Sequence, residues 1–483
     1  MTRLATRLNG TAPSWRLAPD IDIIGITADS RQVRPKMIFA ALPGTRADGR
    51  DFIAAAVGQG AAAVLAPLGT QWPPGTPPRP LLLDADPRQR LAEIAVHLAG
   101  PMPRRIRAVT GTNGKSSSVD FLRQMSIAEG RKAASLGTLG VIASGFPITE
   151  SLTTPDPVAL AGELARLRAA GIDDVALEAS SHGLEQRRLD GITLIGAAFT
   201  NLTRDHLDYH GDMASYRAAK LRLFDTLLPS GAPMIVMSDL EPTTRAALEM
   251  IAKTRRLELL SVGPKGSAID LISATPTPDG QILDITVDGV RRMIDLKLVG
   301  RFQADNALLA AALARATGID RALDYLSGLQ PVRGRLQLVT NLPNGACAYV
   351  DYAHTPDALE RLLTALRPHT RGRLILVFGA GGDRDAGKRP LMGAVAARLA
   401  DLTIITDDNP RTEDPALIRA AIKASCPAGI ELADRRRAIA EALSLAQSGD
   451  VIVVAGKGHE QGQIIGRTII PFDDAAVITE LVG

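Results

Sequence analysis

The sequence predicts an α/β fold in three domains, each with helices packed on a mostly parallel sheet. The chain has 483 residues, which is more than one core of roughly 150 residues accommodates. From residue 104 onward, short apolar runs alternate with helical patterns, as they do in parallel sheets, and a second such series starts near residue 345. We therefore expect a small N-terminal α/β domain over 1–86, a central domain over 87–331 and a C-terminal Rossmann-like domain over 332–483.

The elements of the first half follow from local signals. A Pro/Gly-rich stretch, PLGTQWPPGTPPRP, covers residues 67–80. A helix is predicted after it, because Asp86 is a suitable N-cap, Pro87 a suitable first helical residue and Gly100 a suitable stop. The predicted strands are RRIRAV, DDVALEAS, GAAFTNL and APMIVMS, and the helices between and after them are SSSVDFLRQMSIAEG, SYRAAKLRLFDTLL and TRAALEMIAKT.

The second half begins with a change of pattern. Over residues 268–300, short segments with the turn sequences TPDGQ and VDGV predict antiparallel hairpins, and the helix ADNALLAAALARATG follows. Four further apolar runs, each separated by helical sequence, predict a second α/β sheet with the topology of a nucleotide-binding fold. These runs are GACAYVDYAH, RLILVFGAGG, DLTIITDD and GDVIVVAGKG.

Composition excludes several classes of function. Charged residues make up 22% and hydrophobic residues 46% of the sequence, as in globular proteins. With 3% aromatic residues and a net charge of +3, we expect no binding of a nucleic-acid polymer. No apolar run approaches the ~20 residues that span a bilayer, so we expect no membrane insertion. Cys347 and Cys426 form no C-x-x-C pair, which indicates a reducing, cytoplasmic location.

The strongest local motif is a glycine-rich turn between a strand and a helix, in RRIRAVTGTNGKSSSVDFL. The N–H groups of such a P-loop-type turn bind phosphate, its lysine reaches the outer phosphates, and its hydroxyl binds Mg²⁺. The full G-x-x-x-x-G-K-[ST] pattern is incomplete, because Val109 occupies the position of the first glycine. By itself the turn is compatible with a kinase, an ATPase or a ligase. An ordinary strand-to-helix turn is the alternative without function.

Carboxylate and imidazole groups follow two predicted strands of the central domain. Glu178 ends the strand in VALEASSHG, where the ligands of open parallel sheets converge, and Mg²⁺ prefers such oxygen ligands. A salt bridge at the strand end is the alternative for Glu178. The segment TNLTRDHLDYHG adds Asp205, His206, Asp208 and His210.

Two other catalytic interpretations of this region are not favoured. His206 and His210 have the spacing of a zinc-binding helix, but the glutamate of H-E-x-x-H is missing. Ser181 adjoins His182, but the G-x-S-x-G turn of a serine nucleophile is absent. Lys220, in YRAAKLRLF, would ordinarily be a solvated helix lysine.

Taken together, eight motifs in order resemble the Mur ligases of peptidoglycan synthesis. They are TGTNGKSS, TTPD, EASSHGLEQRRL, FTNLTRDHLDYHGDMASYRAAKLRLF, VDYAHTPDALE, FGAGGDRDAGKRPLMG, DNPR and AGKGHE. The similarity extends from DSRQVRP, at 29–35, to the last predicted strand. The resemblance implies an enzyme that joins an amine to a peptide carboxylate with ATP and Mg²⁺ through an acyl phosphate. Its implied substrates are UDP-MurNAc-L-Ala-D-Glu and meso-diaminopimelate, and we expect a monomer.

The resemblance also assigns roles to residues of the central domain. The implied phosphate ligands are Gly111, Thr112, Asn113, Gly114, Lys115 and Ser116. Ser116 and Glu178 are implied to hold one Mg²⁺, and His206 helps to hold a second. Lys220 matches a lysine that is carbamylated in the family, so that it supports the metal site and acts in catalysis with Lys115 and His206.

Further implied contacts involve all three domains. The adenine and ribose end of ATP is expected at Asn306, Arg335, Asp351 and His354, with the nucleotide between domains. The implied contacts to the muramyl peptide are Thr153, Thr154, Ser180, Gln186 and Arg188. Ser30 matches a contact to UDP in the first domain.

The turn DDNPRTEDP, at 407–415, combines a guanidinium with oxygen acceptors. Meso-diaminopimelate carries an amine and a carboxylate at both ends, so its far end suits Arg411 and nearby oxygens. Relatives that add lysine usually lack D-N-P-R, and the resemblance therefore favours diaminopimelate. The implied contacts are Arg384, Asp408, Asn409, Pro410, Arg411, Gly456 and Glu460.

Other functions remain alternatives at the level of the sequence. Within the same fold, they are a ligase for another amino acid and a folylpolyglutamate-type enzyme, although the DSR motif of the first domain argues against the second. A P-loop kinase or regulatory NTPase would act without an amine acceptor. A nucleotide-binding scaffold would show no turnover.

Overall fold

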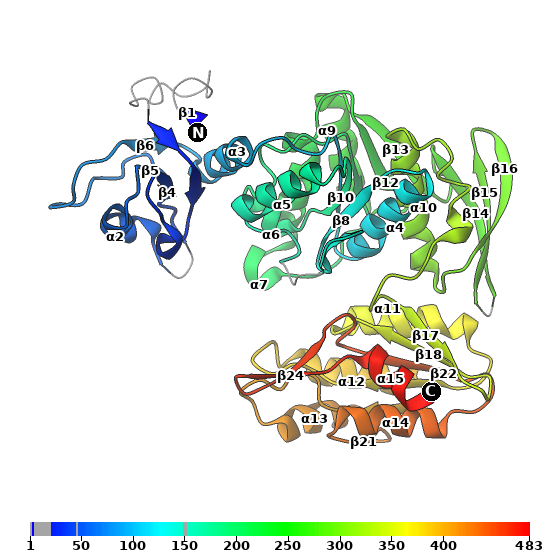
Figure 1. Ribbon diagram of the computed structural model, residues 1–483. Coiled ribbons are helices and arrows are strands. Elements are labelled where there is room, and N and C mark those ends of the chain that lie inside the picture. The colour runs from blue at the N-terminus through cyan, green and yellow to red at the C-terminus, as the bar shows by residue number, and fades with distance from the viewer. Residues whose placement is uncertain (1, 4–20, 45–46, 148–151, 278) are drawn as a thin grey trace. The chain divides into compact units, whose positions relative to one another are not determined.

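The computed structural model has the mixed α/β architecture that the sequence predicts (Figure 1). The residues that it describes are 2–3, 21–44, 47–147, 152–277 and 279–483. The chain divides into two compact units, which are 1–261 with 309–322, and 262–308 with 323–483. The first unit holds the N-terminal and central sheets, and the second holds an antiparallel ribbon and the C-terminal sheet.

The N-terminal sheet has four parallel strands in sequence order. They are β3 (Gly25–Thr27), β4 (Met37–Ala40), β5 (Ala63–Pro67) and β6 (Leu81–Asp84). Helix α2 (Ile53–Gly58) packs on one face of the sheet and α3 (Pro87–Ala99) on the other, so that each face has its own hydrophobic core. A short antiparallel pair, β1 (Thr2–Arg3) and β2 (Asp22–Ile23), precedes these strands in the sequence.

Helix α3 confirms the capping signals read from the sequence. The side chain of Asp86 accepts a hydrogen bond from the N–H of Gln89 (3.1 Å), Pro87 is the first helical residue, and Gly100 ends the helix with a φ of 101°. Leu91 packs into the core of the N-terminal sheet, and the helix also contacts α5 (Pro157–Ala169). The domain boundaries at 86/87 and 331/332 stay predictions.

The part of the ten-stranded central sheet that lies in the first unit includes the strand order β12-β11-β7-β10-β8-β9. Its strands are β7 (Arg105–Thr110), β8 (Ala133–Gly137), β9 (Gly140–Ala143), β10 (Asp174–Glu178), β11 (Gly196–Phe199) and β12 (Pro233–Met237). All neighbouring strands are parallel except β8 and β9. Because helices cover both faces, strands such as β10 and β11 are buried along their whole length, as expected for a parallel sheet.

The helices of this part of the chain are α4 (Lys115–Ala128), α5, α6 (Ser181–Glu185), α7 (Leu207–His210), α8 (Met213–Arg222), which continues as a π-helical turn over Leu223–Leu227, and α9 (Pro242–Arg255). Helices α4, α8 and α9 match the helices that the sequence predicted in this part of the chain, whereas α5, α6 and α7 were not predicted. Strand β7 lies between β10 and β11, although β8 follows it in the chain. The strand order thus reverses next to β7, and the loops after β7, β10 and β11 meet at the carboxyl edge, where open sheets bind ligands.

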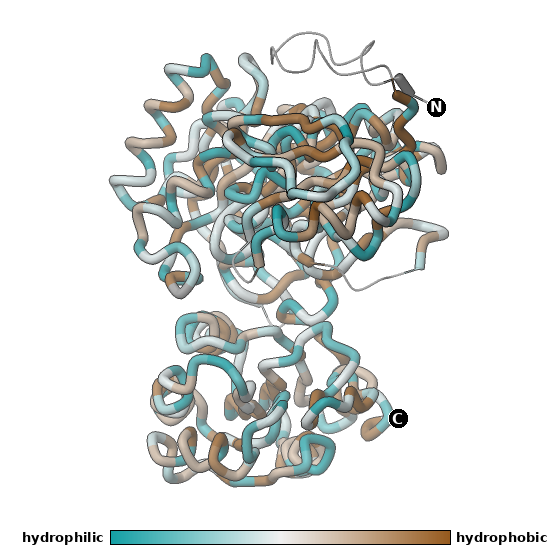
Figure 2. The backbone as a smooth tube through the Cα atoms, turned by 90° about the vertical axis from the view of Figure 1, so that its left-hand side faces the viewer, coloured by the Kyte–Doolittle hydropathy of each residue, from teal (hydrophilic) through white to brown (hydrophobic). Residues whose placement is uncertain are grey.

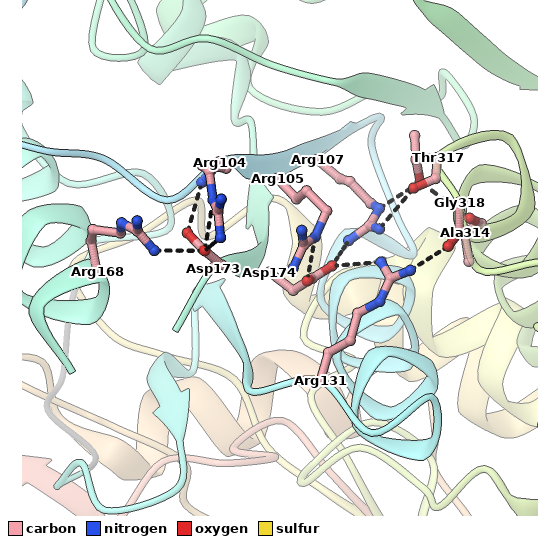
Figure 3. Close-up of polar contacts among 10 residues, drawn as sticks. All are labelled: Arg104, Arg105, Arg107, Arg131, Arg168, Asp173, Asp174, Ala314, Thr317 and Gly318. Carbon is pink, nitrogen blue, oxygen red and sulfur yellow. Dashed lines mark hydrogen bonds and ion pairs between the residues drawn. The ribbon is translucent and has the colours of Figure 1, made fainter. Parts of the chain in front are cut away.

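The opposite edge of this sheet is held by buried charges (Figure 3). Asp174, the first residue of β10, pairs with Arg107 (2.9 Å), Arg105 (2.6 Å) and Arg131 (3.4 Å). The side chains of Asp174 and Arg107 are 0% and 1% exposed. Arg107 also donates to Thr317 Oγ1 (2.6 Å) and thereby links β7 to the end of a distant helix. These contacts fix the sheet from the edge that faces away from the candidate site.

The second unit begins with the antiparallel ribbon that the turn sequences predicted. Strands β14 (Ile269–Thr277), β15 (Gly280–Val287) and β16 (Val290–Leu296) pair in sequence order. The last residues of β13 (Glu258–Gly263) pair in parallel with β14. Helix α10 (Arg301–Ala316) follows the ribbon.

The C-terminal sheet has the strand order β17-β18-β22-β19-β20-β21. Its strands are β17 (Gln337–Asn341), β18 (Cys347–Asp351), β19 (Leu374–Phe378), β20 (Leu402–Ile405), β21 (Ile430–Glu431) and β22 (Val451–Ala455). Only β17 is antiparallel to its neighbour. Strand β22 inserts between β18 and β19, so the loops after β19, β20 and β22 come together at the carboxyl edge.

Helices cover both faces of that sheet, as the Rossmann-like prediction requires. Helices α11 (Pro356–Leu366), α12 (Lys388–Leu399) and α13 (Pro415–Lys423) pack on one face, and α14 (Arg435–Leu445) and α15 (Asp474–Val482) on the other. A hairpin of β23 (Gly462–Ile465) and β24 (Thr468–Pro471) precedes α15. Hydrophobic and hydrophilic residues alternate along the helices, which can be followed in Figure 2. In the described part of the chain, no helix has the length and apolar character needed to cross a membrane.

Candidate functional site

The predicted phosphate loop joins β7 to α4 in a closely packed turn. Gly111 has a φ of 144°, and a Cβ atom there would lie 1.9 Å from Thr200 Oγ1, so no other residue fits. Gly114 precedes the helix in the left-handed conformation, with a φ of 87°. Helix α4 therefore begins at Lys115 with its N-terminus at the loop, which is the arrangement that binds phosphate.

The segment after β11 supports this loop. The N–H groups of Thr112 and Asn113 donate to the backbone oxygen (2.9 Å) and the Oδ1 atom (3.0 Å) of Asn201. Thr200 Oγ1 donates in return to the Asn113 carbonyl (2.6 Å). Two of the amides that were assigned to phosphate are thus used within the protein. Asn201 was not identified from the sequence, although a polar pair directly after a buried strand was the signal for it.

Two lysines converge on one carbonyl of the loop. Lys115 Nζ donates to the carbonyls of Gly111 (2.9 Å) and Thr112 (2.8 Å), and Lys220 Nζ donates to the same Gly111 carbonyl (2.7 Å). Lys220 is 1% exposed, and its ammonium lies 4.4 Å from the ring centroid of Tyr216. Burial, and then the nearby Lys115 cation, hold the pKa of Lys220 well below its usual value. The alternative of a solvated helix lysine is therefore wrong.

Glu178 ends β10 as a buried carboxylate, 2% exposed. It accepts hydrogen bonds from the N–H (2.9 Å) and hydroxyl (3.3 Å) of Thr138, which the sequence analysis did not identify. The Thr138 hydroxyl also lies 3.0 Å from that of Thr153. No lysine or arginine among the described residues pairs with Glu178, so the salt bridge considered as an alternative is not found. Buried carboxylates without a cationic side chain are typical of metal sites.

The histidines of this region form a cluster of rings. The ring of His182 lies 5.0 Å from that of His206 and 5.3 Å from that of His210. His206 is half exposed, with Nε2 3.4 Å from Asp205. His210 Nε2 lies 3.0 Å from Ser181 Oγ. This histidine is not His182, the residue that follows Ser181 in the sequence. Ser181 is only 2% exposed, which argues against a nucleophile.

Metal binding here requires groups beyond carboxylate and imidazole. Among the residues that the structure describes, no group of three or more His, Cys, Asp and Glu side chains is placed to hold a metal ion. Mg²⁺ retains several water ligands and accepts hydroxyl and phosphate oxygens. Ser116, in the first turn of α4 and 7% exposed, provides a hydroxyl directly after Lys115.

Four of the residues expected to contact the muramyl peptide share one hydrogen-bond network. Thr154 Oγ1 donates to the Glu178 carbonyl (2.8 Å) and accepts from the N–H and the hydroxyl of Ser180 (both 3.0 Å). Arg188 donates to the Thr154 carbonyl (2.6 Å) and to the side chain of Gln186 (2.8 Å). The network begins at the end of β10 and so lies directly beside the Glu178 carboxylate.

Two other expected substrate contacts lie at the borders of this arrangement. Thr153 joins it through Thr138, as described above. Tyr209, which the sequence analysis missed, accepts a hydrogen bond from Gln186 (2.9 Å). Ser30 lies apart in the N-terminal sheet region, as the first residue of a 3-10 turn that is capped by Asp29.

In the second unit, the expected amino-acid contacts gather at the carboxyl edge of the C-terminal sheet. Arg411, after β20, has a φ of 50°, and its N–H donates to the carbonyl of Ile464 (3.0 Å). Its guanidinium donates to the carbonyl of Gly382, in the loop after β19 (2.8 Å). Among the described residues, this is the only hydrogen bond of the Arg411 side chain. Arg384 is exposed in the same loop as Gly382.

The remaining contacts come from the turns after β20 and β22. Asn409, 3% exposed, donates from Nδ2 to Glu460 Oε2 (2.8 Å). A Cβ atom on Gly456 would lie 2.5 Å from Asp408 Oδ2, so these two residues face each other closely. The carbonyl of Pro410 packs against Gly382 in the neighbouring loop. The turns after β20 and β22 thus bring a cation, two carboxylates and an amide to the same edge of the sheet.

The residues expected at the adenine and ribose end of ATP also lie close to each other. Asp351, the last residue of β18, accepts from the N–H groups of Leu336 (2.6 Å) and Ala353 (2.8 Å). Burial raises the pKa of Asp351 despite the nearby Arg335. The Arg335 guanidinium lies 4.5 Å from the ring centroid of Tyr352.

Two further members of this group connect to the same linker. His354 Nδ1 lies 2.8 Å from the Tyr352 carbonyl. In α10, Asn306 contacts Gln303 (3.4 Å), which donates to the carbonyl of Arg335 (3.1 Å). The structure therefore brings all four expected residues to the linker around 335 and the end of β18.

Comparisons with known proteins define the class to which this fold and these loops belong. Three protein-family models match the chain: the Mur ligase family catalytic domain at residues 22–95, the Mur ligase middle domain at 109–314, and the Mur ligase glutamate ligase domain at 334–458. The chain belongs to the Mur ligase family, whose members are ATP-dependent amide ligases.

Its relatives point to one branch of that family. A protein of Caulobacter vibrioides named UDP-N-acetylmuramoyl-L-alanyl-D-glutamate--2,6-diaminopimelate ligase is 54% identical, over 95% of each chain. A protein of the same name from Mesorhizobium japonicum is 49% identical, over 94% of each chain. A solved structure of such a ligase is 33% identical, covers 95% of this chain and 94% of its own, and has a TM-score of 0.70.

Proposed function

We propose that this protein uses ATP to join meso-2,6-diaminopimelate to the D-glutamate carboxylate of UDP-MurNAc-L-Ala-D-Glu in peptidoglycan synthesis. The observation that carries the proposal is the Arg411 turn. It presents a guanidinium at the same edge of the sheet as the turns that carry Asp408 and Glu460, in a chain that is 54% identical to a ligase named for this amino acid. The two free thiols, Cys347 and Cys426, support a cytoplasmic location.

The chemistry follows from the weak reactivity of a carboxylate. Transfer of the terminal phosphoryl group of ATP to the carboxylate oxygen gives an acyl phosphate and ADP. The amine then attacks the acyl carbon, the amide bond forms, phosphate leaves, and the amine gives up a proton. Such phosphoryl transfer depends on positioning and on neutralising charge, and Lys115 at the start of α4 is placed to do both.

The residues of the loop and of β10 fit a magnesium ion. Bound Mg²⁺ would neutralise charge on the phosphate oxygens. The hydroxyl of Ser116 and the buried carboxylate of Glu178 would hold it; Glu178 is oriented by Thr138 and has no cationic side-chain partner among the described residues. His206, half exposed beside this region, is assigned to a second ion.

Lys220 contributes as a carbamate. Because its pKa is depressed by burial and by Lys115, a larger fraction of its amine is neutral near neutral pH. A neutral amine adds to CO₂ and releases a proton, which converts the side chain into an anion. We expect a carbamate carbon resonance in protein equilibrated with ¹³C-bicarbonate, and its loss in Lys220→Ala. If wild-type protein treated in this way shows no carbamate resonance, Lys220 does not act as a carbamate.

The function is tested by a ligation assay with a panel of amino acids. Purified protein is incubated with ATP, Mg²⁺ and UDP-MurNAc-L-Ala-D-Glu, and with meso-diaminopimelate or lysine. We expect tripeptide product and ADP with diaminopimelate and little product with lysine. ADP release that does not require an amino acid would instead indicate a kinase or NTPase, and efficient use of lysine would overturn the assigned substrate.

Arg411→Ala should raise the KM for diaminopimelate. The change removes a charge-assisted hydrogen bond to the distal carboxylate, which is worth about 1.5 to 3 kcal/mol, or roughly 10- to 100-fold in KM. The KM for ATP should change little. Arg467→Ala, an exposed arginine in the turn between β23 and β24, is the matched control. A large loss of ATP affinity with an unchanged amino-acid KM would show that the turn has another role.

A further inference from the structure

The turn after β22 contains a buried cation, Lys457, that the proposed reaction does not yet use. Lys457 is 0% exposed. Its Nζ atom donates to Asn409 Oδ1 (3.0 Å) and to Glu460 Oε2 (3.1 Å). Burying a charge is costly unless the charge is paired and hydrogen-bonded. Both partners of Lys457 are among the residues expected to contact the amino acid, which indicates that its burial serves the candidate amino-acid site.

Lys457 also determines which way the amide of Asn409 points. Oδ1 of Asn409 accepts from two donors, Lys457 Nζ and the N–H of Ile464 (2.9 Å). Neither donor can pair with an amide NH₂ group, so the amide nitrogen must face the other way. It donates there to Glu460 Oε2 (2.8 Å). A reversed amide would direct its NH₂ group at both of these donors and its oxygen at the Glu460 carboxylate.

The carboxylate of Glu460 is thereby held at one oxygen. Oε2 accepts from both Lys457 and Asn409, whereas no described residue donates to Oε1. The Glu460 side chain is 33% exposed, so part of the carboxylate is accessible to a ligand. Lys457 itself, being fully buried, cannot touch one. The Lys457 ammonium neutralises part of the negative charge of the candidate amino-acid site, to which the Glu460 and Asp408 carboxylates contribute.

The backbone beneath this arrangement is fixed by a second buried pair. Arg435 and Asp474, both with side chains 0% exposed, form a bidentate salt bridge (2.7 Å for each bond). Arg435 also donates to the carbonyls of Ala455 (3.0 Å) and Asp407 (3.4 Å), which lie at the starts of the two turns. The turns that carry Asn409 and Lys457 are therefore held together before any ligand binds.

We propose that Lys457 is a positioning residue for amino-acid binding. It locks Asn409 and Glu460 so that Glu460 Oε1 is presented to the ammonium group of the incoming amino acid. This inference rests on the proposed function, because it takes the turns that carry Arg411 and Glu460 as the amino-acid site. It adds a residue that does not contact the substrate but sets the geometry of those that do.

The test is the pattern of Michaelis constants in Lys457→Met. With ATP and the UDP-linked peptide saturating, we expect the KM for diaminopimelate to rise by on the order of ten-fold or more. The KM values for ATP and for the UDP-linked peptide should stay within about two-fold. Lys423→Met is the control for replacing a lysine in this domain. Lys423 lies in helix α13, which packs on the same sheet. An unchanged KM for diaminopimelate, or an equal rise in all three constants, would overturn the proposal.

A double-mutant cycle guards against general damage to the fold. Glu460→Gln combined with Lys457→Met removes both charges, so the double variant contains no glutamate that has lost its lysine partner, even if Lys457→Met alone folds poorly. In the Glu460→Gln background, adding Lys457→Met should change the KM by less than about two-fold, because its target is already gone. Additive effects of the two changes would overturn the positioning role.

Titration calorimetry separates this inference from the proposed function. In one outcome, the wild-type protein binds diaminopimelate and makes product while the Lys457→Met variant binds it with equal affinity. That result would overturn only the positioning role. Wild-type protein that binds no amino acid of the panel would overturn both. If lysine is the amino acid used, the same constants measured with lysine decide whether Lys457 positions Glu460.

Discussion

Replacing Lys115 with alanine should lower the rate of ligation by on the order of 10³-fold. Lys115 is the first residue of α4, and its ammonium is held at the carbonyls of Gly111 and Thr112. In the proposed reaction, that position would place a cation where the terminal phosphoryl group meets the loop. No neighbouring side chain can replace it, because Lys220 is buried and is assigned to a carbamate. The loss should appear mainly in kcat, since charge grows on the phosphoryl oxygens during transfer.

Lys132→Ala provides the matched control, because Lys132 is an exposed lysine of the same unit. Its rate should equal that of the unchanged protein. Single-turnover measurements of product and ADP separate the transfer step from product release. A Lys115→Ala variant that ligates at an unchanged rate would contradict the assignment of the 111–116 loop to ATP phosphates. Such a result would reopen the interpretation of the chain as a scaffold.

The second large effect is on stability. Asp174→Ala should reduce the free energy of unfolding by about 3 to 5 kcal/mol. The change leaves Arg107, 1% exposed, without its anion, and it removes the shared partner of Arg105 and Arg131 (Figure 3). A buried guanidinium without a counter-charge keeps its full desolvation cost. The effect should appear as a lower midpoint of denaturant unfolding that is followed by two independent probes.

Glu163→Ala is the control for this prediction. Glu163 pairs with Arg166 on the surface of α5, with side chains 32% and 46% exposed. Exposed pairs of this kind contribute about 0.2 to 1 kcal/mol. If Asp174→Ala costs no more than Glu163→Ala, the arginines must be hydrated and the cluster does not hold the sheet edge. Because the cluster lies opposite the carboxyl edge, catalysis by the folded fraction should be unchanged.

Much of the fold was predictable because its signals are local. Asp86, Pro87 and Gly100 define α3 through capping chemistry that acts within a few residues. Consecutive residues likewise indicate the strand, the glycine turn and the helix around Lys115. Hydrophobic runs predicted buried strands such as β10 and β22, since a strand covered on both faces must be apolar throughout, but they missed the buried strand β8.

The support of the site was not predictable in this way. Asn201 shapes the phosphate loop only because β11 lies next to β7, and Thr138 orients Glu178 only because β8 lies next to β10. Strand order is a property of the whole sheet and leaves no local trace in sequence. The wrong interpretation of Lys220 has the same origin, because the helix pattern alone does not tell which face is covered.

By itself, the sequence determined which residues could carry the chemistry: a lysine after a glycine turn, a glutamate at a strand end, and an arginine among oxygen acceptors. It did so because charge, hydroxyl and conformational freedom belong to single residues. Only the tertiary structure decided that Lys220 is buried against Gly111 and that Lys457 is buried between Asn409 and Glu460. Burial and pairing depend on segments that are distant in the chain, and these alone set the pKa of a lysine or the direction of an amide.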